Sequence, residues 1–143
     1  MPDRLFIDTN ILAYLVNEDS QFHRKVVSGF KRASGRYELW TSRQVLREYA
    51  VVMTRHDIME KPLSPKEVIS DIKKWQMILR IADENEDVTK ALLELIRAHQ
   101  VKGKRIHDAN IVASMKVNWI GRLWTMNVHD FQGITDAEII SLP

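Results

Sequence analysis

The sequence has no cysteine, few prolines and glycines, and no long apolar run: its 143 residues include four prolines and five glycines. The lack of cysteine excludes disulfides, a thiolate zinc site, an iron–sulfur cluster and a cysteine nucleophile. No segment approaches the roughly 18 consecutive apolar residues of a membrane-spanning helix. The first four residues, Met-Pro-Asp-Arg, lack the basic region and apolar stretch of a signal peptide. We therefore expect a cytoplasmic protein that does not enter a membrane.

The chain also lacks a strong charge of either sign, since 21 Lys and Arg stand against 19 Asp and Glu for a net charge of +2. This excess is too small to indicate nucleic-acid binding, because surfaces that bind phosphates usually carry a strong basic excess. If several of the acids gather around cations, however, the remaining residues carry a larger positive excess.

What is present fits one ordinary globular domain over residues 1–143, with 45% hydrophobic and 28% charged residues and no repeat or low-complexity segment. Short apolar runs rich in β-forming residues alternate with segments of helical period. We expect strands at 5–7, 37–40, 77–82, within 119–126 and at 138–142. Helices are expected at 10–15, 20–33, from 42, at 64–75, at 88–101 and from 108. This alternation predicts an α/β fold with a doubly wound, mostly parallel sheet flanked by helices.

Helix boundary signals support this reading. Ser42 can cap the helix that carries Glu48, and Ser64 is followed by proline and then, at the third position, by Glu67, as in a capping box. Gly103 is a natural left-handed stop for the helix before it.

Four acids from separate segments are candidates for chemistry. Asp8 ends the first strand, and Asp130 lies in the turn after the strand that ends near Thr125. Glu48 lies in a helix that follows a strand, and Asp108 opens another helix. Ligands of open α/β sheets bind beyond the carboxyl ends of the strands, so the four carboxylates could converge at one edge.

Each acid also has a plainer interpretation. Asp8 and Asp108 stand where an acid can cap a helix. Glu48 alone would be a solvated helix residue, and Asp130 alone a turn residue bonded to its own backbone. The functional hypothesis therefore depends on the set rather than on any one acid. Basic residues that flank Glu48 and Asp108 can contact phosphates; they are Arg43, Arg47, Lys102, Lys104 and Arg105.

Four segments together resemble the PIN-domain family, in order and spacing over nearly the whole chain. They are Phe-Ile-Asp-Thr-Asn at 6–10, Ser-Arg-Gln-Val-Leu-Arg-Glu at 42–48, Ile-His-Asp-Ala-Asn-Ile-Val-Ala at 106–113 and Thr-Met-Asn-Val-His-Asp-Phe at 125–131. The likeness is strongest to the VapC toxins of bacterial toxin–antitoxin pairs. It implies a doubly wound parallel sheet, RNA cleavage by a metal-dependent acidic cluster, an antitoxin partner and a homodimer.

Carried over residue by residue, the resemblance implies that Asp8, Glu48, Asp108 and Asp130 hold Mg²⁺ or Mn²⁺. These hard cations prefer oxygen ligands, and they can activate a bound water and stabilise charge on an attacked phosphate. We take that water as the nucleophile. Thr9, Asn10 and Thr125 are expected to orient the carboxylates. Family members often carry acids at the positions of both Asn127 and Asp130, so Asn127 is a candidate to share or replace part of the role of Asp130, besides helping to orient the carboxylates.

Three other functions stay open. An aspartyl phosphatase also places an acid after its first strand, but it usually needs a second acid where this chain has Asn10. A PIN-like domain that binds RNA or a partner without cutting is a second alternative. A DNA nuclease is a third, because a site built around phosphate need not read the 2′-hydroxyl.

Overall fold

The computed structural model describes residues 3–142 and contains a five-stranded sheet of order β3-β2-β1-β4-β5. Every neighbouring pair of strands is parallel. The strands are β1 Asp3–Ile7, β2 Tyr37–Ser42, β3 Arg80–Ala82, β4 Arg122–Trp124 and β5 Glu138–Ile140. The predicted doubly wound parallel sheet is thereby confirmed.

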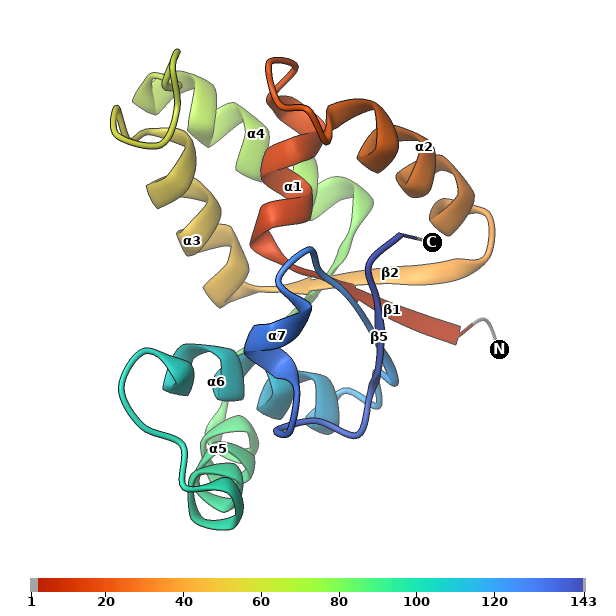
Figure 1. Ribbon diagram of the computed structural model, residues 1–143, viewed down its shortest axis with the longest axis vertical. Coiled ribbons are helices and arrows are strands. Elements are labelled where there is room, and N and C mark those ends of the chain that lie inside the picture. The colour runs from red at the N-terminus through yellow and green to blue at the C-terminus, as the bar shows by residue number, and fades with distance from the viewer. Residues whose placement is uncertain (1–2, 143) are drawn as a thin grey trace.

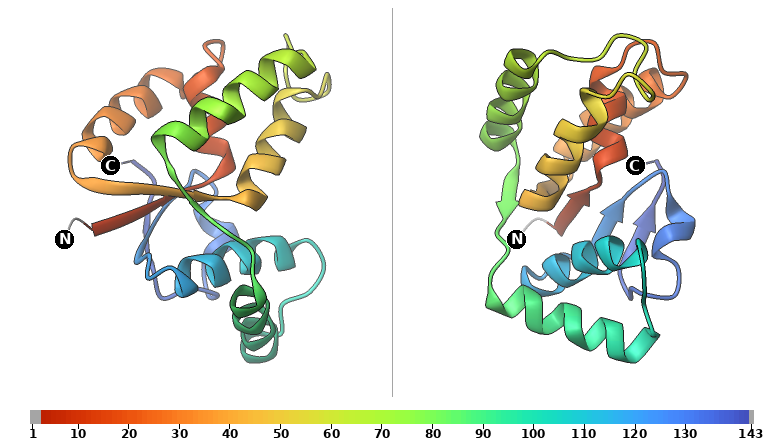
Figure 2. Two further views of the ribbon diagram at one scale, coloured as in Figure 1. Left: turned by 180° about the vertical axis from the view of Figure 1, so that it is seen from behind. Right: turned by 90° about the vertical axis from the view of Figure 1, so that its left-hand side faces the viewer.

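Helices cover both faces of the sheet. Figures 1 and 2 show α1 to α4 on one side and α5 and α6 on the other, with the short α7 beside the end of β4. The helices are α1 Thr9–Val16, α2 His23–Ser34, α3 Arg43–Met53, α4 Pro65–Ile78, α5 Glu86–His99, α6 Arg105–Val117 and α7 Val128–Phe131. Among the described residues, no helix has both the length and the apolar character needed to cross a membrane.

The core lies on both faces of the two central strands. Leu5, Phe6 and Ile7 of β1 are fully buried, as are Leu123 and Trp124 of β4. A parallel strand covered by helices on both faces has no solvent side, so its sequence is continuously apolar instead of alternating. This is why so short a run as residues 5–7 predicts the central strand correctly.

Two predicted helix starts are confirmed in detail. Ser42 caps α3 by accepting a hydrogen bond from the backbone N–H of Val45. Ser64 and Glu67 form the expected reciprocal capping box at the start of α4. Such caps depend on neighbouring residues alone and are therefore readable from sequence.

Several helix boundaries differ from the prediction, and α2 begins at His23, three residues after its expected start. The α4 helix continues to Ile78, so β3 is shorter than the expected extended segment. The α5 helix ends at His99 because Gln100 takes the left-handed conformation (φ 52°), before Gly103 is reached. The α6 helix begins at Arg105 without a side-chain cap, three residues before the expected start.

Candidate active site

The four candidate acids line one pocket, of about 830 Å³, at the edge where β1 and β4 end. Asp8 follows β1 directly, Glu48 comes from α3, Asp108 from the first turn of α6 and Asp130 from α7. The parallel topology is the cause, because it brings the carboxyl ends of all strands to the same edge.

Asp8 is buried and held from several sides. Its carboxylate accepts hydrogen bonds from the backbone N–H of Thr9 (2.8 Å), from Thr125 Oγ1 (2.8 Å) and from Asn10 Nδ2 (3.2 Å). Its own N–H donates to the carbonyl of Trp124, which ties the end of β1 to β4. Asp8 therefore caps α1, as its plainer interpretation predicts, and also reaches the pocket.

Glu48 is half-buried and fixed at both oxygens. Thr9 Oγ1 donates to Oε2, and Gln44 Nε2 donates to Oε1, each at 2.9 Å. A carboxylate offers about four acceptor positions, so two remain for a further ligand. The interpretation of Glu48 as a solvated helix residue is wrong, because a tertiary hydrogen bond from Thr9 and one from Gln44 within α3 hold its half-buried side chain.

Asp108 is half-buried, as Glu48 is, and Asp130 is exposed. Asp108 does not cap α6, whose N-cap is Lys104. Its carboxyl group therefore has no capping role of the kind predicted for it alone, and it lines the pocket instead.

Burial and mutual repulsion leave two of these groups electrostatically strained. Desolvation by burial raises the pKa of Asp8 to about 6, against the hydrogen bonds from Thr125 and Thr9 that lower it. Desolvation raises the pKa of Asp108 to about 6 as well, and the charges of Asp130, Asp8 and Glu48 raise it further. A cation in the pocket would relieve this repulsion.

The donor set suits a hard divalent cation, because carboxylate oxygens are the ligands that Mg²⁺ and Mn²⁺ prefer. Within residues 3–142, no three acidic or histidine side chains form a group that could hold a metal as they stand. The carboxylates thus surround the pocket rather than meet at one point.

The structure brings the predicted orienting residues to the acids. Asn10 Nδ2 contacts both Asp8 and Thr125 Oγ1, and its Oδ1 accepts from the N–H of Met126. The side chain of Asn10 is thus hydrogen-bonded at both its nitrogen and its oxygen, and an amide cannot act as the second acid of an aspartyl phosphatase. Asn127 lines the pocket, and its N–H donates to Thr125 Oγ1.

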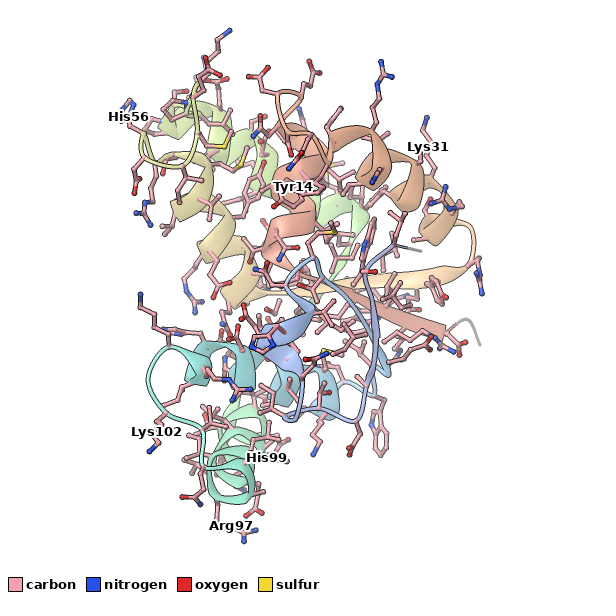
Figure 3. All side chains as sticks on the ribbon, in the orientation of Figure 1. Tyr14, Lys31, His56, Arg97, His99 and Lys102 are labelled. Carbon is pink, nitrogen blue, oxygen red and sulfur yellow. The ribbon has the colours of Figure 1, made fainter. Side chains whose placement is uncertain are left out.

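The candidate phosphate contacts are distributed around the rim. Arg47 lines the pocket and pairs with Glu84 at 3.2 Å. Arg43 pairs with Asp83 at 2.9 Å, outside the pocket. Arg105 donates to the carbonyl of Gln132, and Lys104 is exposed at the start of α6. Figure 3 shows Lys102 on the α5–α6 loop, pointing away from the fold.

Sequence reasoning missed Gln44, which is 4% exposed and lines the pocket. Its Nε2 donates to Glu48 and to the backbone carbonyl of His107, and its Oε1 accepts from Asn110 Nδ2. The available signal was its place four residues before Glu48 on the same helical face. On sequence alone such a pair is typical of an exposed helix.

The pocket has a second, apolar half that extends away from the acids. Its wall comes from α1, α3 and the connection after α3, and Figure 3 shows Tyr14 on the part contributed by α1. The lining residues are Ala13, Tyr14, Val51, Val52, Ile58 and Met59. Ile58 and Val51 are about half exposed, at 49% and 54%. One continuous hollow therefore combines an acidic end with an apolar one.

Comparison with known proteins agrees with the resemblance to the PIN-domain family. A sequence model of the PIN domain matches residues 5–129. Ribonuclease VapC24 of Mycobacterium tuberculosis is 24% identical over 128 residues, which cover 89% of this chain and 88% of that protein.

Solved structures share the fold. VapBC2 from Rickettsia felis, bound to a DNA fragment from its promoter, superposes with a TM-score of 0.73 at 17% identity, covering 98% of this chain and 99% of that one. Mycobacterium tuberculosis VapC20, a toxin that cleaves the sarcin–ricin loop, gives a TM-score of 0.67 at 18% identity, covering 94% and 98%.

Proposed function

Because the chain belongs to the PIN-domain family, we propose that it is a metal-dependent endoribonuclease and the toxin of a type II toxin–antitoxin pair. The observation that carries the proposal is the shared pocket of Asp8, Glu48, Asp108 and Asp130. Among the described residues that line it, Arg47 is the one Lys or Arg. An acidic pocket of this kind repels a phosphodiester unless cations are bound, which favours metal-assisted hydrolysis over direct phosphate binding by side chains.

The four acids would hold Mg²⁺ or Mn²⁺. When bound, the cation lowers the pKa of a coordinated water and stabilises negative charge on the attacked phosphate. The carboxylate of Asp8 is oriented before a cation binds, because hydrogen bonds from Thr125, Asn10 and the N–H of Thr9 fix its plane. Thr9 also donates to Glu48 and so couples two of the acids through one residue.

Around the acids, other side chains would guide the RNA backbone. Arg47 lies at the rim. Arg43 lies on α3, which carries Glu48, and Lys104 and Arg105 lie at the start of α6, which carries Asp108. The ion pairs of Arg43 and Arg47 with Asp83 and Glu84 are exposed at both partners or nearly so, and exposed pairs exchange readily for a phosphate.

A cognate antitoxin protein would occupy the pocket and block it. The solved relatives include complexes of VapB with VapC proteins and a toxin–antitoxin complex from Klebsiella pneumoniae. The apolar half of the pocket supports this assignment, since an RNA backbone gains little from such a wall whereas an apolar peptide segment would bury it. Within a cell we place the pair in the cytoplasm, where RNA is available.

We also propose that the chain pairs as a homodimer. The described residues leave large apolar side chains of α4 exposed, with Ile69 at 54%, Met77 at 84% and Ile78 at 56%. Light scattering at micromolar concentration tests this point, and a single species of monomer mass would overturn it.

The test of function is cleavage of labelled bulk transfer RNA by the purified protein with Mg²⁺, with Mn²⁺ and with chelator. The Asp8→Asn variant is the inactive control, and Asp3→Asn, at the opposite edge of the sheet, is the matched control. We expect cutting that needs the metal and disappears only in Asp8→Asn. Hydrolysis of small phosphomonoesters without RNA cleavage would instead indicate a phosphatase. Metal binding with intact RNA would indicate a domain that binds without cutting, and equal cleavage of DNA would remove the restriction to RNA.

A further inference from the structure

The buried amide of Gln44 joins the two helices that carry Glu48 and Asp108. The α3 and α6 helices lie on opposite sides of the sheet (Figure 1), and the side chain of Gln44 crosses between them. From α3 it contacts Glu48 on its own helix, the carbonyl of His107 in the first turn of α6, and Asn110 one turn further along α6. His107 immediately precedes Asp108.

The orientation of this amide is determined by its partners. The Glu48 carboxylate and the His107 carbonyl can only accept hydrogen bonds, so the amide nitrogen must face both, at 2.9 Å each. The amide oxygen then faces Asn110 Nδ2 at 2.8 Å, which is a donor. Both N–H groups and the oxygen are thus used, and no rotated arrangement satisfies the same three partners.

We infer that Gln44 is a positioning residue that sets the separation between Glu48 on α3 and Asp108 on α6. The inference rests on the proposed function, because the separation of these acids determines whether both can reach one cation. The two hydrogens of its amide nitrogen are donated to Oε1 of Glu48 and to the backbone carbonyl of His107, the residue before Asp108. A single amide group therefore links the two acids.

Two features distinguish this role from simple filling of the core. First, the hydrogen bond from Gln44 to the His107 carbonyl joins α3 to the first turn of α6, and is therefore a tertiary anchor for the turn that carries Asp108. Second, burial at 4% exposure desolvates a polar amide, and an apolar side chain would fill the same space without that cost. Outer groups that orient ligands typically change metal affinity or activity by about 10- to 100-fold when removed.

The experiment is titration of the folded, metal-free protein with Mn²⁺, followed by calorimetry, for wild type and three variants. Gln44→Met removes all three hydrogen bonds at similar length. Gln44→Glu keeps an oxygen for Asn110 but loses both donors and adds a negative charge. Gln76→Met, at an exposed position of α4, is the matched control.

We expect the Mn²⁺ dissociation constant to rise about 10- to 100-fold in both Gln44 variants and to stay unchanged in Gln76→Met. RNA cleavage should fall at low Mn²⁺ and recover partly at high Mn²⁺, while RNA affinity in chelator stays constant. The Gln44→Glu variant separates two effects on Mn²⁺ affinity, the loss of the positioning hydrogen bonds and the gain of a negative charge. If only negative charge governed cation binding, Gln44→Glu would bind Mn²⁺ more tightly than wild type, and that result would overturn the inference.

Circular dichroism melting shows which variants fold. Should Gln44→Met fail to fold, Asn110→Ala provides a second route, because it releases the amide oxygen of Gln44 and leaves its donors in place. We expect Asn110→Ala to lose less Mn²⁺ affinity than the Gln44 variants. The double variant of Asn110→Ala and Gln44→Glu should bind Mn²⁺ about as weakly as Gln44→Glu alone, since the two residues act as one unit.

Two failures can be told apart. Wild-type protein that binds no Mn²⁺ and cuts no RNA overturns the proposed function, and the role of Gln44 with it. Wild-type protein that binds Mn²⁺ while the folded Gln44 variants bind it equally well overturns the role of Gln44 alone.

Discussion

At the edge of the sheet where the strands begin, acidic and basic side chains pair across neighbouring strands, whereas at the edge where the strands end the acids stand together. At the first edge Glu38 of β2 lies between Arg4 of β1 and Arg80 of β3, at 3.3 and 3.4 Å. Arg122 of β4 in turn joins Asp3 of β1 and Glu138 of β5, at 2.9 and 3.0 Å. All five strands are thus connected by alternating charge.

At the opposite edge the acidic side chains of the pocket have no ion-paired basic partners among the described residues. Asp8, Glu48, Asp108 and Asp130 form no ion pair among the described residues, and burial and repulsion raise the pKa of two of them. The same sheet therefore has one edge where charge is neutralised and one where it is left uncompensated. Uncompensated buried charge costs stability, so its presence at one place points to a functional requirement there.

The largest expected effect comes from removing one charge at the acidic edge. If Asp108 is a metal ligand, as the proposed function has it, Asp108→Asn should lower metal-dependent RNA cleavage at least about 100-fold, since a ligand matters more than the groups that orient it. Without metal the same variant should melt at a higher temperature than wild type, because it removes repulsion by Asp130, Asp8 and Glu48. Cleavage rates and melting curves measure both effects. A variant that is less stable and fully active would contradict the contrast between the edges.

The next effect is a pH dependence that only the acidic edge should produce. The pKa of Asp8 is about 6 in the folded chain against 3.8 for the free group, so the folded state holds more protons between those values. Stability from this group is therefore present below about pH 4 and is lost as pH rises through 6. We expect the melting temperature of Asp8→Asn, relative to wild type without metal, to increase from pH 4 to about 6.5 and then level off.

Addition of metal should reverse that loss. At pH 7.5 and a Mn²⁺ concentration about 100 times its dissociation constant, wild type should gain about 2.7 kcal/mol in the free energy of unfolding. Asp8→Asn should gain less. If the difference in stability between wild type and Asp8→Asn did not change with pH or with Mn²⁺, the burial of the Asp8 charge would have no energetic consequence.

At the edge where the strands begin, substitutions of the ion-paired residues should lower stability without changing RNA cleavage. Arg122→Gln removes the ion pairs with Asp3 and Glu138 and the contact of the guanidinium with the ring of Tyr37. Because these groups are partly exposed, we expect a loss of only about 1 kcal/mol in the free energy of unfolding. Urea unfolding at low salt and at 1 M salt measures it, and the difference from wild type should shrink at high salt. RNA cleavage should be unchanged.

The two edges also differ in how far sequence could predict them. The strand at 5–7 and the caps at Ser42 and Ser64 were readable because they depend on local pattern, and the alternation of elements then gave the parallel sheet. From that topology the meeting of the four acids at one edge could be predicted, although none of them is distinctive alone.

What sequence did not reveal depends on partners distant in the chain. Gln44 and Asn110 are 66 positions apart, and nothing around either predicts that their side chains meet. The early start of α6 at Arg105 has no side-chain cap to mark it in the sequence, because local backbone hydrogen bonds from Ile106 to Gly103 and from His107 to Lys104 close its first turn. The ion pairs of the other edge depend on strand order, which pattern alone leaves open.

The smallest expected effect concerns Arg47, the basic residue at the rim of the acidic pocket. Its side chain is 66% exposed and pairs with Glu84, so it is screened by solvent and has another partner nearby. Arg47→Gln should weaken RNA binding only a few-fold at low salt. Because one phosphate contact contributes about 0.7 for a single strand and about 0.9 for B-form DNA to the slope of log affinity against log salt, the magnitude of that slope should decrease by up to about one. Filter binding over a salt series, in an Asp8→Asn background that prevents cleavage, measures it. An unchanged slope would mean that Arg47 makes its ion pair with Glu84 and no phosphate contact, and that RNA binding depends on bound cations or on the other basic residues of the rim.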